Sequence, residues 1–130
     1  MIAWDTNLLV RHLAEDDPDQ TAQVREQLGK AKRAGELIYL SQLAITETAW
    51  VLQSGFSLRK QEVLFTLEDV TKDTRFLLEG GAVIPEAIKR ARSKGDLPEH
   101  IIALSAKAAG ARKTQTFDQA LKRFPEFEIL

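Results

Sequence analysis

The chain has 130 residues, of which 18 are basic and 19 acidic, giving a formal net charge of −1. Hydrophobic residues make up 44% and charged residues 28%, as expected for a globular domain with its own core and not for a disordered chain. The chain contains no cysteine, which excludes a disulfide scaffold and thiolate metal sites and favours a cytoplasmic location.

Strands and helices are predicted to alternate along the chain. In order, we expect a strand at residues 2–4, helices at 6–13 and 18–34, a strand at 36–40, helices at 42–53 and 58–70, a strand at 76–78, helices at 85–94 and 97–109, a strand at 113–117, a short helix at 119–124 and an edge strand at 127–130. This alternation predicts a single α/β domain over residues 1–130. We expect a three-layer α/β/α sandwich with a mainly parallel central sheet.

Helix boundary signals support several of these elements. Asp17 and Pro18 are typical of a helix start, Gly35 of a helix end, and Ser41 of the N-cap of the next helix. No apolar run approaches the ~20 residues that a membrane span needs. An acidic residue at position 5 interrupts the start that a signal peptide would have, so we expect neither a signal peptide nor membrane contact.

Acidic side chains stand at positions that favour an active site. Asp5 and Asp118 each follow a predicted strand directly, and the carboxyl ends of parallel strands share one sheet edge, where ligand sites form. Glu99 is in the first turn of its helix, with Asp96 just before it. Glu47 lies in an apolar helix, so we expect it to point partly toward the packed side, and we expect the rings of Trp4 and Trp50 in the core.

Each of these residues also has a purely structural interpretation. Asp5 and Asp118 are plausible helix caps, and Asp96 with Glu99 has the spacing of a capping box. Glu47 would then be a solvated helical carboxylate. The helical Arg11 either faces solvent or offsets the charge of the acidic residues. The hydroxyl and amide side chains beside the acidic residues are either caps or groups that orient water or phosphate: Thr6, Asn7 and Thr116.

A cluster of carboxylates requires a cation, because unpaired carboxylates repel one another. Oxygen-only ligands suit Mg²⁺ or Mn²⁺, and neither histidine has a spacing that suggests zinc. Such an ion can activate a water against a phosphodiester. The sequence therefore favours divalent-metal chemistry if these carboxylates meet.

Three motifs in this order resemble the PIN-domain nucleases, and most closely the VapC-type toxins of toxin–antitoxin pairs. The chain opens with Asp5-Thr6-Asn7-Leu8-Leu9-Val10-Arg11, continues with Thr46-Glu47-Thr48-Ala49-Trp50-Val51-Leu52, and later carries Thr116-Phe117-Asp118. The resemblance covers nearly the whole chain. It departs from the family at Asp96-Leu97-Pro98-Glu99, where the family usually reads D-F-A-D, so either Glu99 or Asp96 supplies the third carboxylate.

The resemblance implies a Mg²⁺- or Mn²⁺-dependent endoribonuclease. By this resemblance the catalytic residues are Asp5, Glu47, Glu99 and Asp118. The metal ligands come from Asp5, Asp96, Glu99 and Asp118. The residues that orient substrate or water are Thr6, Asn7, Arg11 and Thr116. It also implies a homodimer, an RNA substrate and a cognate antitoxin protein. The alternative is a PIN-like module that binds RNA or protein with weak or no cleavage, because its third motif is altered. A phospho-acceptor receiver or phosphatase is disfavoured, because Asp5-Thr6-Asn7 lacks a second Asp.

Overall fold

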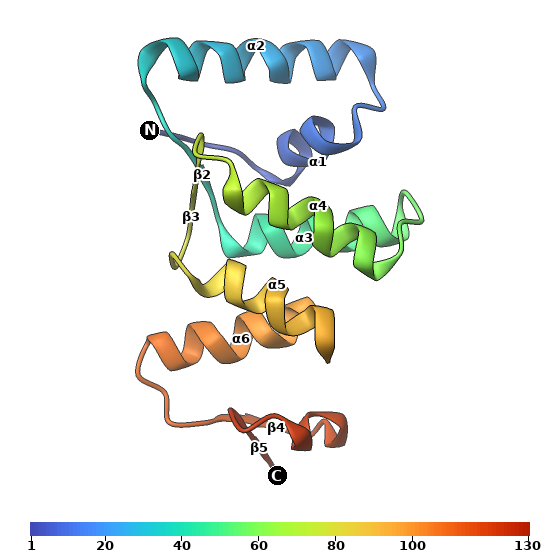
Figure 1. The fold of residues 1–130 in the computed structure, drawn as a ribbon, viewed down its shortest axis with the longest axis vertical. Coiled ribbons are helices and arrows are strands. Elements are labelled where there is room, and N and C mark those ends of the chain that lie inside the picture. Colours follow the sequence, from blue (N-terminus) through green and yellow to red (C-terminus); the bar gives the residue numbers. More distant parts are fainter. The chain divides into compact units, whose positions relative to one another are not determined.

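The computed structural model describes all residues, Met1–Leu130, and the chain divides into two compact units. Unit 1 is Met1–Gly81 and unit 2 is Ala82–Leu130. Figure 1 traces the helices and strands of both units in chain order.

Unit 1 is built from three short strands separated by pairs of helices. Its elements are β1 (Ile2–Ala3), α1 (Thr6–Ala14), α2 (Pro18–Ala34), β2 (Ile38–Leu40), α3 (Gln42–Ser54), α4 (Lys60–Lys72) and β3 (Phe76–Leu78). The strands form one parallel sheet in the order β1-β2-β3, with Ile38 paired to Ile2 on one side and to Phe76 on the other. Parallel neighbours need long crossovers, and each helix pair supplies one.

The core of unit 1 consists of apolar side chains that recur at strand or helix spacing in the sequence. Ile38 and Leu40 of the middle strand are fully buried, together with Leu9, Ile45, Leu52, Leu64 and Leu67 from all helices except α2. α2 contributes Val24, Leu28 and Ala31. The predicted boundary residues also act as expected: Asp17 and Ser41 accept hydrogen bonds from the first turns of α2 and α3, and Gly35 ends α2 with a φ of 65°.

Unit 2 pairs two helices with a small sheet. It contains α5 (Val83–Ser93), α6 (Leu97–Ala108), β4 (Thr114–Thr116), the 3₁₀ helix η1 (Gln119–Arg123) and β5 (Phe127–Ile129). α5 packs on α6, and β4 pairs with β5 in parallel, Thr114 opposite Phe127. The fully buried Ile84, Ala87 and Ala91 lie along one face of α5.

The predicted fold class is confirmed: the chain is mixed α/β, and every strand pair is parallel. The strands form two sheets, one of three strands and one of two. One expectation about the core is wrong. Trp4 is buried at 4% exposure, but Trp50 is 69% exposed. None of the helices is long and apolar enough to cross a membrane.

Candidate active site

Asp5 stands between the first strand and the first helix, as predicted. Its backbone is extended, and its Oδ1 accepts a hydrogen bond from the backbone N–H of Leu8 at 3.1 Å, so it is the N-cap of α1. The side chain is exposed, and only one of its two carboxylate oxygens is used by the cap. The structural role and the predicted catalytic role are therefore compatible in the same residue.

Glu47 is joined to the first motif through Thr6. The hydroxyl of Thr6 donates a hydrogen bond to Oε2 of Glu47 at 2.7 Å, although 41 positions separate the two residues. This contact follows from the packing of α1 against α3. Asp5 and Thr6 are adjacent, so the D-T-N motif and the central glutamate motif are next to each other in unit 1.

The expectation that Glu47 points toward the packed side is wrong. Leu43 and Trp50, one turn before and after it on α3, are 67% and 69% exposed, and Glu47 is exposed with them. The buried side of α3 is formed by Ala44, Ile45, Thr48, Ala49 and Leu52. A carboxylate on the open face avoids the desolvation that a packed position would impose, and it stays accessible to a ligand.

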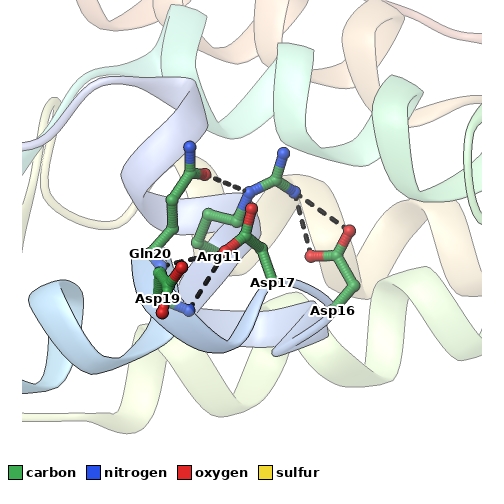
Figure 2. Close-up of polar contacts among 5 residues, drawn as sticks. All are labelled: Arg11, Asp16, Asp17, Asp19 and Gln20. Atoms are coloured by element: carbon green, nitrogen blue, oxygen red, sulfur yellow. Dashed lines mark hydrogen bonds and ion pairs between the residues drawn. The ribbon is translucent and has the colours of Figure 1, made fainter.

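Arg11 binds residues to which no motif and no helical spacing connects it. Its Nη1 donates to both carboxylate oxygens of Asp16, at 2.9 and 3.2 Å, and its Nε donates to Oε1 of Gln20 at 2.6 Å. Figure 2 shows this cluster, in which Asp17 caps the backbone N–H groups of Asp19 and Gln20. The acidic run at residues 15–17 was the available signal, but a partner five positions from Arg11 is not implied by helical spacing.

In unit 2, Asp96 and Glu99 form the capping box that their spacing suggests. The Asp96 side chain accepts from the backbone of Glu99, and Oε2 of Glu99 accepts from the backbone N–H of Asp96 at 3.2 Å. Pro98 occupies the first turn of α6, where its missing N–H costs nothing. Glu99 is half-buried, and its other oxygen takes no part in the box.

Asp118 and Thr116 are arranged in a second local turn of unit 2. The backbone N–H of Asp118 donates to the hydroxyl of Thr116 at 3.0 Å, and Oδ1 of Asp118 accepts from the backbone N–H of Ala120 at 2.9 Å. Asp118 is thus the N-cap of η1. It is exposed beside Phe117, which is 82% exposed, so this turn stands open to solvent.

Both histidines pack against aromatic rings. His12 lies edge-on to Trp4 and Phe76, with ring centroids 5.8 and 5.7 Å apart. Burial, together with the positive charge of Arg75, lowers the pKa of His12 below its ordinary value. His100 is buried, and its Nε2 lies 2.6 Å from the carbonyl oxygen of Lys94.

The predicted ligand residues have the chemistry that a hard cation requires. Each carboxylate uses one oxygen in a hydrogen bond from the protein and keeps the other: Asp5, Glu47, Glu99 and Asp118. Carboxylate oxygens of this kind suit Mg²⁺ or Mn²⁺. Neither unit by itself contains a group of three or more acidic or histidine side chains that could hold a metal ion. In unit 1 the structure brings Thr6 to Glu47, and in unit 2 it brings Asp96 to Glu99 and Thr116 to Asp118.

Comparison with known proteins identifies the family. The model of the PIN domain family matches residues 2–126, which takes in both units and all three motifs. The comparisons with curated proteins and with solved structures gave no match. PIN domains are generally nucleases that use divalent metal ions. The match extends over nearly the whole chain, the fold is α/β with parallel strands, and the motifs keep carboxylate oxygens free. We therefore conclude that the chain belongs to the PIN domain family.

Proposed function

We propose that this protein is a Mg²⁺- or Mn²⁺-dependent endoribonuclease and the toxin of a toxin–antitoxin pair. The observation that carries the proposal is the hydrogen bond from Thr6 to Glu47, because it joins two of the three family motifs across 41 positions. Helix capping is enough to explain the presence of Asp5 at its position. It does not explain why Thr6 donates a hydrogen bond to an exposed glutamate of another helix.

In such a reaction some of the carboxylates would bind the metal ion and another would accept a proton. A bound Mg²⁺ or Mn²⁺ would supply charge for the phosphodiester and a more acidic water. Asp5, Glu99 and Asp118 would hold the ion through the carboxylate oxygens that their backbone hydrogen bonds leave unused, and Asp96 is the alternative third ligand. Thr6 fixes the orientation of Glu47, whose second oxygen remains able to accept a proton from water. Asn7, Arg11 and Thr116 would position substrate or water.

The charge distribution supports an RNA substrate. Unit 2 carries nine Lys and Arg residues against six Asp and Glu residues, a formal charge of +3, whereas unit 1 carries nine against thirteen, a formal charge of −4. Lys107, Arg112 and Lys113 line one cavity of about 230 Å³ in unit 2. Basic side chains provide the salt-dependent contacts to phosphates on which binding of nucleic acid depends.

A toxin of this kind has protein partners as well as a substrate. We propose a cytoplasmic homodimer that is silenced by a cognate antitoxin protein. Expression of the chain alone should arrest growth of a bacterial host, and co-expression of the cognate antitoxin should restore growth. Normal growth on expression of an active nuclease would remove the toxin role while leaving the enzymatic proposal intact.

A second candidate function is a PIN-like module that binds RNA or protein without cutting it. The observation that favours it is the capping box, which engages Glu99 in helix capping at the point where the family usually has an aspartate. RNA that is bound equally with and without divalent metal, and never cleaved, would support this alternative.

The decisive experiment compares the purified protein with its Asp5→Asn variant on structured RNA, in Mg²⁺, in Mn²⁺ and in EDTA. Asparagine is an equally good N-cap, so the variant should fold like the native chain. We expect cleavage only with metal, and a loss on the order of 1,000-fold in the variant, since a metal ligand contributes several kcal/mol. Asp17→Asn, the same change at the N-cap of α2, is the matched control and should keep its activity. Cleavage that persists in EDTA or in Asp5→Asn would refute the proposal.

A further inference from the structure

A cavity of about 360 Å³ lies between α1 and α2, next to the first catalytic motif. Its volume is within the range of small-molecule sites, about 300–1,000 Å³. It opens beside Leu8, whose N–H is the one that Asp5 caps, and it includes the neighbouring Asn7. The remaining lining comes from one more residue of α1 and from α2: Arg11, Gln20, Gln23, Val24, Glu26 and Gln27. Two of the lining residues, Asn7 and Leu8, therefore belong to the first turn of the helix that Asp5 caps.

The lining is rich in amides and has an apolar part. Asn7, Gln23 and Gln27 each carry a group that can both donate and accept hydrogen bonds, and all three are exposed. Leu8 and Val24 form the apolar part of the lining. A nucleobase has this combination of properties, since its faces are apolar and its edge carries donors and acceptors.

Two donors in this lining are already held in place and remain unused. Asp16 fixes Nη1 of Arg11, and Oε1 of Gln20 accepts from Nε of Arg11. This leaves Nη2 of Arg11 and the amide nitrogen of Gln20. In Figure 2 both nitrogens point to the same side of the cluster, away from the carboxylates of Asp16 and Asp17. Both residues line the cavity, so these two nitrogens are donors that it can offer to a ligand.

The charge of this region disfavours a phosphate. Asp16 already neutralises Arg11, Glu26 is part of the lining, and unit 1 as a whole has a formal charge of −4. A neutral base edge meets no such repulsion. Two adjacent donors require two adjacent acceptors, and O6 and N7 of guanine provide them, whereas adenine offers N7 beside a donor.

We propose that the cavity between α1 and α2 is a specificity subsite that binds a guanine base of single-stranded RNA through Arg11 and Gln20. This inference rests on the proposed nuclease function and adds base selection next to the cut. Gln20 acts here as a specificity residue that recognises the base and has no part in the chemistry.

The test has one arm that depends on cleavage and one that does not. In the first, a pool of random single-stranded RNA is cut in Mn²⁺ and the ends are sequenced, with the native chain and with Gln20→Met. We expect guanine to be enriched at one fixed position near the cut, and the variant to lose about tenfold of that preference. Gln53→Met, the same change at an exposed glutamine of α3 outside the cavity, should keep it.

In the second arm, side-chain amide signals of the labelled protein are followed by NMR in EDTA while guanosine, adenosine, cytidine or inorganic phosphate is added. We expect guanosine to shift the Gln20 amide more than the other probes do, and Gln20→Met to abolish saturable binding of guanosine. A larger response to phosphate than to guanosine would overturn the proposal, because it would make the cavity a backbone contact.

The failures of the two proposals can be distinguished. Absence of metal-dependent cleavage together with selective guanosine binding would refute the nuclease and retain the subsite. Metal-dependent cleavage without guanine enrichment, together with no selective guanosine shift, would refute the subsite and retain the nuclease.

Discussion

The two units hold their predicted catalytic glutamates in different ways. In unit 1, Glu47 is held by Thr6 from another helix, 41 positions away. In unit 2, Glu99 and Asp118 are each held by hydrogen bonds to groups no more than three positions away. A local turn keeps its geometry wherever the turn forms, but the Thr6–Glu47 contact exists only while α1 packs on α3. The position of Glu47 therefore depends on tertiary packing, whereas Asp5, Glu99 and Asp118 are held by their local sequence.

The largest expected effect tests this dependence on packing. Ile45 is fully buried on α3, two positions before Glu47. Ile45→Ala should lower the free energy of unfolding by about 3 kcal/mol, because it removes buried methylene and methyl groups and leaves a cavity. Leu43→Ala on the same helix, at 67% exposure, should change it by less than about 0.5 kcal/mol. Urea denaturation measures both, and equal losses would contradict the assignment of the buried face of α3.

The next effect separates capping from catalysis in unit 2. Glu99→Gln keeps an oxygen that can accept from the backbone N–H of Asp96 but removes the charge, so activity should fall on the order of 100-fold with little change in stability. Glu99→Ala loses the capping contact as well, and its free energy of unfolding should drop by about 1 kcal/mol. Full activity in Glu99→Gln would show that this residue is a cap only.

A smaller effect concerns the contact that joins the motifs in unit 1. Thr6→Val retains the shape of the side chain but removes the donor to Glu47, so we expect about a tenfold loss of cleavage with unchanged stability. Thr66→Val is the matched control on α4, where the hydroxyl donates only to the backbone carbonyl of Glu62. Equal activity of the two variants would mean that the Thr6–Glu47 bond has no part in the reaction.

The smallest effect is a pH dependence in the core of unit 1. Burial, and then the charge of Arg75, lower the pKa of His12 below its ordinary 6.5, so the unfolded chain takes up this proton more readily than the folded one. The contribution of His12 to stability is complete above about pH 6.5 and is lost as the pH falls through its folded pKa.

The variant His12→Phe isolates this contribution. It keeps ring contacts with Trp4 and Phe76 but cannot titrate, so its stability should fall less between pH 7 and pH 5 than that of the native chain. Urea denaturation across that range measures the difference. Parallel pH profiles would show that His12 is not the titrating group.

The same contrast between local and distant contacts explains what the sequence could predict. The caps at Asp17 and Ser41 and the Asp96–Glu99 box were predictable, because their donors and acceptors are fixed by spacing within one turn. The exposed face of α3 was not, because apolar residues surround that helix on nearly every side and its periodicity does not select a buried face. The partners of Arg11 depend on the course of a loop, which no periodicity describes. The ligand roles of the carboxylates remain predictions.

The contrasting surroundings of Trp4 and Trp50 give the protein two intrinsic optical reporters. Trp4 is enclosed by His12 and Phe76, while Trp50 stands in solvent one turn from Glu47. A water-soluble quencher should therefore suppress the red-shifted emission of Trp50 and spare the blue-shifted emission of Trp4. A cation bound by Asp5, next to the Thr6 that holds Glu47, should change the emission of Trp50 and leave that of Trp4 unchanged, so a fluorescence titration can follow binding without labels and before any bond is cut.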